Sequence, residues 1–119
     1  MKTKINLKRV YDPADDSDGR RILVDRLWPR GVSKERARID LWLKEAGPST
    51  ELRKWFGHDP KRWEEFRRRY RAELETNAAL DTLKDIASEH AVVTLVFGAT
   101  NRTHNQAVVL KEVLQANAD

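Results

Sequence analysis

The sequence predicts a small layered α/β sandwich, in which a mostly parallel sheet of about four strands is flanked by helices. Residues 22–24 form a continuous apolar run, and residues 92–97 are apolar except for Thr94; both segments have the hydrophobicity of strands that are buried on both faces. Strand patterns alternate along the chain with the 3.6-residue period of amphipathic helices, which is typical of layered α/β proteins. At 119 residues the chain has the usual length of one domain, so we expect residues 1–119 to share one hydrophobic core.

The first half of the chain is expected to supply three of these strands. Residues 4–11 largely alternate between apolar and polar side chains, which predicts the first strand. An acidic segment then ends in an Asp-Gly turn signal and leads into the second strand at 22–24. Ser33 can cap a short helix over 34–38, and the alternation of residues 39–44 predicts a third short strand.

The middle of the chain is expected to be helical. Ser49 can cap a short helix, and Asp59 can cap a longer one that has Pro60 in its first turn. A further helix is expected near 78–89. The apolar residues of the longer helix fall on one face, and they are Trp63, Phe66, Tyr70 and Leu74.

The last two elements are expected to be a buried strand and a helix. Residues 92–97 form the strand, and a polar loop follows it. Thr103 and Gln106 have the spacing of a capping box, which predicts that the last helix begins at His104.

Composition excludes several classes of function. The chain has no cysteine, which excludes disulfides, thiolate metal sites and thiol nucleophiles. The three histidines share no metal-ligand spacing and no cofactor-binding motif is present, so we expect neither a metal nor a cofactor. No apolar run approaches the ~20 residues that span a bilayer, and no secretion signal is recognisable, which predicts a cytoplasmic protein without membrane association. The net charge of +4 favours an anionic partner, although both signs are mixed along the chain.

Polar side chains follow the two buried strands, and they form the candidate site. Because ligands of open α/β sheets bind beyond the carboxyl ends of the strands, parallel neighbours would bring both loops to one crevice. The first loop has the sequence DRLWPRG at 25–31, and the second extends over 98–105. The candidate ligand-binding residues of these loops are Arg26, Trp28, Arg30, Thr103, His104 and Asn105.

A small anionic ligand, bearing phosphate or carboxylate, suits this crevice. The N–H groups at the start of the last helix carry partial positive charge, and Arg26 and Arg30 could each bind an anion through two donors. The alternative is that Arg26 pairs with Asp12 or Asp25 as part of the scaffold. His104 is expected to be neutral at the helix start and is the one weak candidate for proton transfer; the alternative is an ordinary surface histidine.

The arginine-rich helix expected within 60–75 offers a second hypothesis. Arginines lie there beside aromatic side chains, a mixture that can bind nucleic acid. However, Trp63 and Tyr70 belong to the apolar face, and glutamates offset most of the charge, some at i,i+4 spacing. A salt-bridged helix that faces solvent is therefore the favoured interpretation. Nucleic-acid binding is the alternative, and a non-catalytic protein-interaction domain that uses exposed tryptophans is a third hypothesis.

Three blocks of the sequence resemble a known family. They are RRILVDRLWPRGVSKE at 20–35, IDLWLKEAGPSTELRKWF at 39–56 and VTLVFGATNRTHNQAVVL at 93–110. Together with the apolar face of the long helix, they make the chain similar to the YeaO-like branch of domain-of-unknown-function family 488. The resemblance implies a compact α/β fold of bacterial or archaeal cytoplasm and implies no particular activity. Wider members often carry Cys-His-Arg before the last helix, where this chain has Thr-His-Asn at 103–105, so only the histidine carries over.

The resemblance adds three residues to the candidate site. Lys44, Ser49 and Arg53 are polar residues amid the apolar pattern of the second block, and they could close the crevice from its side. The resemblance also strengthens the case for a site at the loop 25–31. A buried strand needs only apolar residues, and it does not need the polar, proline-containing sequence that follows it here. Structural hydrogen bonding of an irregular loop is the alternative role for all of these residues.

Overall fold

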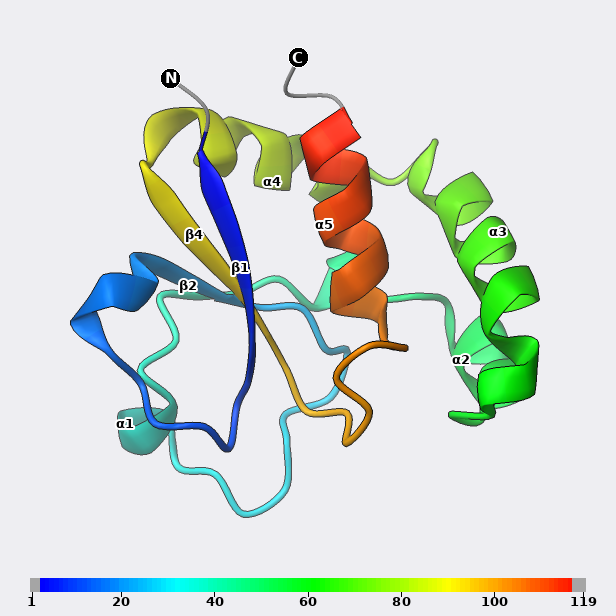
Figure 1. Ribbon diagram of the computed structural model, residues 1–119, viewed down its shortest axis with the longest axis horizontal. Coiled ribbons are helices and arrows are strands. Elements are labelled where there is room, and N and C mark those ends of the chain that lie inside the picture. The colour runs from blue at the N-terminus through cyan, green and yellow to red at the C-terminus, as the bar shows by residue number, and fades with distance from the viewer. Residues whose placement is uncertain (1–2, 117–119) are drawn as a thin grey trace.

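A four-stranded sheet forms the centre of the computed structural model, which describes residues 3–116 (Figure 1). The strands are β1 (Lys4–Arg9), β2 (Arg20–Leu23), β3 (Leu41–Trp42) and β4 (Val92–Phe97). They lie in the order β1-β4-β2-β3, and each neighbouring pair is parallel. The predicted α/β class, with a mostly parallel sheet of about four strands, is therefore confirmed.

Two strands are shorter than their sequence patterns predicted. Of the alternating residues 39–44, only Leu41–Trp42 pairs with β2, because β2 is itself short and the chain then turns into a 3-10 helix at Lys44–Ala46. β1 stops at Arg9 because the N–H of Asp12 turns back to the Arg9 carbonyl at 3.0 Å. The alternating patterns therefore predicted that both strands exist, but they did not predict where the strands end.

Helices occupy most of the remaining chain. The α-helices are α1 (Lys34–Ala37), α2 (Thr50–Phe56), α3 (Trp63–Leu74), α4 (Ala78–Glu89) and α5 (Gln106–Ala116). Ser33 and Ser49 cap α1 and α2 as predicted, since their hydroxyls accept the N–H groups of Arg36 and Leu52, each at 3.1 Å. The expected helix at 78–89 is α4.

The long middle helix begins with a tighter turn than expected. Asp59 caps a 3-10 turn at Pro60–Arg62 by accepting the N–H of Lys61 at 3.0 Å, and α3 begins at Trp63. The predicted apolar face of α3 is confirmed, since all four of its members are buried, and they are Trp63, Phe66, Tyr70 and Leu74.

The last helix begins later than the sequence predicted. The carboxamide oxygen of Asn101 accepts the N–H groups of Thr103 and His104 at 2.9 and 3.0 Å, which forms a turn in place of a helix start. The Asn105 side chain then accepts the N–H of Val108 at 3.2 Å, and α5 begins at Gln106. The capping-box prediction was wrong because the Asn101 side chain accepts the N–H groups of Thr103 and His104, and the helix begins only after this turn.

The helices and the sheet enclose a large core and a smaller one. α5 packs against β1 and β4, and α3 lies on the side of α5 that is away from the sheet (Figure 1). The apolar faces of α2, α3, α4 and α5 fill the larger core. Leu23, Val96 and Ala37 of α1 form the smaller core on the opposite face, where Trp28 and Trp42 pack against them. Within residues 3–116, no helix has the length and apolar character needed to cross a membrane.

Candidate functional site

A cleft of about 720 Å³ opens at the carboxyl ends of β2 and β4. Residues 25–30 after β2 line one side of it, and residues 98–101 after β4 line another. Arg53, Phe56 and His58, from α2 and the turn after it, line a third side. Because β2 and β4 are parallel neighbours, the two loops meet at one edge of the sheet, as the sequence predicted.

Arg26 lies in this cleft and is held by backbone carbonyls. Its Nε donates to the carbonyl of Pro48, and its Nη2 donates to the carbonyl of Gly47 at 3.1 Å. Asp12 pairs instead with Arg102 through two hydrogen bonds of 2.8 and 2.9 Å. The expected alternative, in which Asp12 neutralises Arg26, is therefore wrong.

Asp25, the other proposed partner of Arg26, is fixed by neutral groups. Its Oδ2 accepts the N–H of Gly98 at 2.8 Å, and its Oδ1 accepts the side-chain amide of Gln106. Burial raises the pKa of this carboxyl from 3.8 to about 6, against the opposing effect of the two hydrogen bonds. The sequence placed Asp25 in the loop that follows the second strand, but we had assigned it only the role of a salt-bridge partner and not that of a ligand-binding residue. Its position directly after a buried strand was the available signal.

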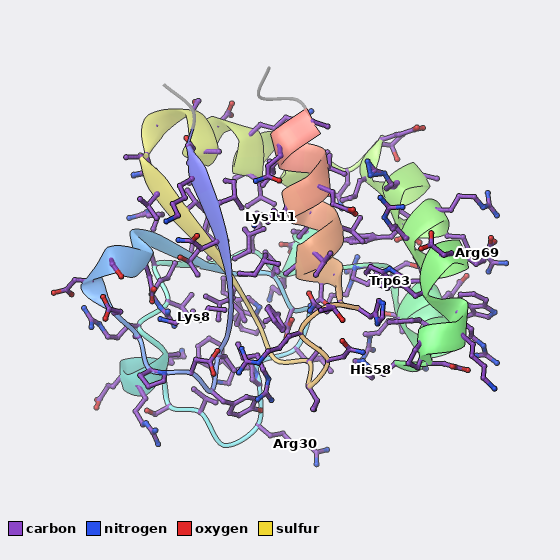
Figure 2. All side chains as sticks on the ribbon, viewed as in Figure 1. Lys8, Arg30, His58, Trp63, Arg69 and Lys111 are labelled. Atoms are coloured by element: carbon purple, nitrogen blue, oxygen red, sulfur yellow. The ribbon has the colours of Figure 1, made fainter. Side chains whose placement is uncertain are left out.

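Two further arginines line the cleft without an acidic partner in the part of the chain that the structure describes. Arg53 is an exposed residue of α2. Arg30 is exposed as well, and Figure 2 shows its side chain extending outward from the 25–31 loop. Neither forms an ion pair, so their charges face solvent at the rim.

Trp28 gives the cleft a rigid apolar wall. Its indole N–H donates to the carbonyl of Val32 at 2.7 Å. Its ring meets Trp42 edge to face, with 5.4 Å between the ring centroids. These contacts fix the orientation of the ring, and Trp28 is among the lining residues.

Lys44 and Ser49 do not line the cleft. The hydroxyl of Ser49 donates to Glu73 at 2.6 Å, and its N–H donates to the same carboxylate at 2.9 Å. The ammonium of Lys44 lies 5.0 Å from the centroid of the Trp42 ring. Both side chains therefore make structural contacts outside the proposed site.

The segment before α5 brings only one of its three predicted residues to the cleft. Thr103 is exposed and bonds to Asn101. His104 also lies outside the lining, because its ring packs 4.9 Å from the Trp63 ring and its Nδ1 is 3.3 Å from the Asn101 amide. Asn105 does line the cleft, although it is 2% exposed and bonds to the Asn101 carbonyl at 2.8 Å.

His58 is a cleft residue that the sequence reasoning missed. It follows Gly57, and both residues have left-handed backbone angles, with φ of 53° for Gly57 and 59° for His58. A non-glycine residue in this region is uncommon, and this one turns the chain from α2 toward α3 (Figure 2). Glycine as the C-cap of α2 could have been predicted, whereas the left-handed histidine had no sequence signal.

Three of the four arginines of α3 form ion pairs with glutamates; the exception is Arg71, whose buried Nη1 has no hydrogen-bond partner among the described residues. Arg67 forms a two-pronged ion pair with Glu112 of α5, with both distances at 2.8 Å. Arg68 and Arg69 share Glu65, and these contacts lower the pKa of Glu65 to about 2. The favoured interpretation of a salt-bridged helix is confirmed. Within residues 3–116, no group of three His, Asp or Glu side chains is placed to hold a metal ion.

Comparisons with known proteins agree on one family. The family model that matches residues 4–119 is described as the inactive DUF488-N3 subclade. The chain is 49% identical over 113 residues to the uncharacterised protein YeaO of Escherichia coli K12, covering 94% of this chain and 97% of YeaO. It is 41% identical over 112 residues to an uncharacterised protein of Mycobacterium tuberculosis H37Rv, covering 94% of each chain. No solved structure matches the chain. The chain therefore belongs to the YeaO-like branch of domain-of-unknown-function family 488, within the subclade described as inactive.

Proposed function

We propose that the cleft binds a small anion, bearing phosphate or carboxylate, and that binding without turnover is its function. The observation that carries this proposal is the contrast between two sets of arginines. Three of the four arginines of α3 are paired with glutamates, whereas Arg26, Arg30 and Arg53 line the cleft with no carboxylate partner among the described residues. An anion in the cleft would supply the missing charge.

Arg26 is the best-prepared of these three arginines. Its guanidinium has five N–H donors, and two of them donate to the carbonyls of Gly47 and Pro48. The two contacts restrict the side chain before a ligand arrives, so less conformational entropy is lost on binding. A charge-assisted hydrogen bond from the remaining donors would contribute about 1.5–3 kcal/mol.

The start of α5 adds to the attraction for an anion. Asn105 and Gln106 line the cleft, and Gln106 is the first residue of this 11-residue helix. The first N–H groups of a helix carry partial positive charge, which favours negative ligands nearby. This effect and the unpaired arginines act in the same direction.

Two observations favour binding over catalysis. His104, the predicted proton-transfer residue, packs on Trp63 outside the cleft lining. The matching subclade is also described as inactive, which is consistent with a fold that keeps a ligand site without turnover. Nucleic-acid binding by α3 receives less support, because the ion pairs of Arg67, Arg68 and Arg69 compensate much of its charge.

A titration with inorganic phosphate tests the proposal. Amide resonances of Gly98 and Asn105 are expected to shift in a saturable way, and Arg53→Ala is expected to weaken the binding several-fold. Arg36→Ala is the matched control, because Arg36 is an exposed arginine of α1 that does not line the cleft. Equal weakening by both substitutions would mean that phosphate responds only to overall charge, and the proposal would fail.

A further inference from the structure

The cleft contains an acceptor as well as the arginines. The Asp25 carboxylate lies on its wall, at the point where β2 ends, and its two hydrogen-bond donors, Gly98 and Gln106, are both neutral. Other buried or half-buried aspartates of the chain have cationic partners: Asp18 contacts Lys8 and Arg21, for example. Within the described residues, Asp25 has no such partner.

The carboxylate is also held firmly in place. A Cβ atom added at Gly98 would lie 2.8 Å from Oδ2 of Asp25 and 3.5 Å from Pro29, so the backbone after β4 approaches the carboxylate as closely as glycine allows. Gln106 of α5 contacts the other oxygen. The acceptor is therefore positioned jointly by β2, β4 and α5, and its orientation does not depend on a flexible side chain at the rim.

Asp25 keeps unused acceptor capacity toward the cleft. A carboxylate offers about four lone-pair sites, and the two hydrogen bonds from Gly98 and Gln106 occupy two of them. Arg26 does not neutralise it, since its guanidinium contacts Gly47 and Pro48. A ligand that carried only negative charge would be attracted by the arginines and repelled by Asp25. A ligand that also carried a hydrogen-bond donor would be attracted by the arginines and by Asp25.

We propose that the ligand of this cleft carries, beside its anionic group, a hydroxyl or ammonium group that donates a hydrogen bond to Asp25. This inference rests on the proposed function, and it narrows the ligand class from any small anion to hydroxylated or zwitterionic anions. The arginines recognise the phosphate or carboxylate, and Asp25 selects among the molecules that carry one. Near pH 8 the carboxylate is ionised, because burial raises its pKa only to about 6.

Three phosphate esters with one skeleton test the inference. Ethyl phosphate, 2-hydroxyethyl phosphate and phosphoethanolamine differ only in ending with a hydrogen, a hydroxyl or an ammonium group. Near pH 8 the full-length protein is expected to bind the two donor-bearing esters more tightly than ethyl phosphate. The expected factor is at least about tenfold for the ammonium ester, because a hydrogen bond between charged groups contributes at least about 1.5 kcal/mol and about 1.4 kcal/mol corresponds to a factor of ten in affinity.

Asp25→Asn is the diagnostic variant, because it removes the charge and keeps the shape. The preference for phosphoethanolamine over ethyl phosphate should disappear in this variant, while ethyl phosphate binds at least as well as before. Asp81→Asn is the matched control, since it removes the same charge from an exposed position of α4. This control should keep the tenfold preference.

The outcomes separate this inference from the proposed function. Equal binding of the three esters, with all three weakened by Arg53→Ala, would overturn the role of Asp25 and leave anion binding intact. A preference that survives Asp25→Asn would also overturn it. Absence of saturable binding for every ester would overturn both proposals.

Discussion

Replacing Asp25 with Asn is expected to stabilise the folded protein near neutral pH. Burial raises the pKa of this carboxyl from 3.8 to about 6, so the folded state holds the proton more tightly than the unfolded state. Between about pH 4 and pH 6 the folded state therefore binds more protons, and the contribution of Asp25 to stability falls as the pH rises. Above this window the folded protein carries the full cost of the ionised carboxylate.

The magnitude follows from the size of the pKa shift. A shift of about 2 units corresponds to about 3 kcal/mol, at about 1.36 kcal/mol for each unit. Asn preserves the local hydrogen bonds, because its oxygen can accept the N–H of Gly98. Its NH₂ group can donate to the side-chain oxygen of Gln106 once that amide rotates. The variant thus removes the charge without leaving either neighbour unpaired.

Urea denaturation of both proteins at several pH values checks this prediction. The difference in the free energy of unfolding between Asp25→Asn and the parent should be small near pH 4 and should grow to about 3 kcal/mol in favour of the variant near pH 8. Other titrating groups change both proteins alike and cancel in this difference. A difference that stays constant with pH, or a variant that is less stable near pH 8, would refute the reasoning.

Four other substitutions test the scaffold, each through the free energy of unfolding in urea. Gly31→Ala is expected to lower the free energy of unfolding by about 1 kcal/mol, because Gly31 has a left-handed backbone conformation. Gly19→Ala should lower it clearly more, because the added Cβ would also lie 2.3 Å from a carbonyl oxygen of β4. Equal losses for the two variants would contradict this reasoning. Asp18→Asn should cost about 3 kcal/mol, because the buried Arg21 loses a carboxylate at 2.6 Å; a cost below about 1 kcal/mol would mean that water replaces it. Tyr70→Phe should cost about 1–2 kcal/mol by leaving a buried carbonyl unpaired, and an unchanged stability would exclude that hydrogen bond.

The sequence was sufficient to predict the fold class and the location of the cleft. Mostly apolar runs marked the two central strands, because strands that are buried on both faces are rich in apolar residues, although Arg21 of β2 and Thr94 of β4 are buried as well. Polar loops after both strands then located the edge where a cleft could open. Each of these patterns concerns one segment of the chain. The parallel pairing of β2 with β4 brings the two loops together at one edge of the sheet.

The contacts of individual side chains could not be predicted in the same way. Thr103 and Gln106 had the spacing of a capping box, but Asn101 captured the N–H groups and Gln106 turned to Asp25. Ser49 was correctly identified as a cap, yet its second role toward Glu73 depends on how α2 and α3 pack. The contacts of Gln106 and Ser49 join segments that are distant in sequence, so a pattern within one segment does not determine them. The turn at Asn101 is local, but it competes with a cap at Thr103 for the same stretch of backbone.

The strand order has a consequence for how the chain is made. β4 lies between β1 and β2, and it is the last strand to be synthesised. A chain emerging from the ribosome therefore carries β1 without any neighbour, and β2 with only the two-residue β3, until residue 97 has left the exit tunnel. Pairings between such distant segments form slowly, because a long loop must close before they gain any stabilisation. The sheet and the cleft at its edge can therefore form only after β4 has been synthesised. Until then, the apolar strand segments are exposed and can associate with those of another nascent chain.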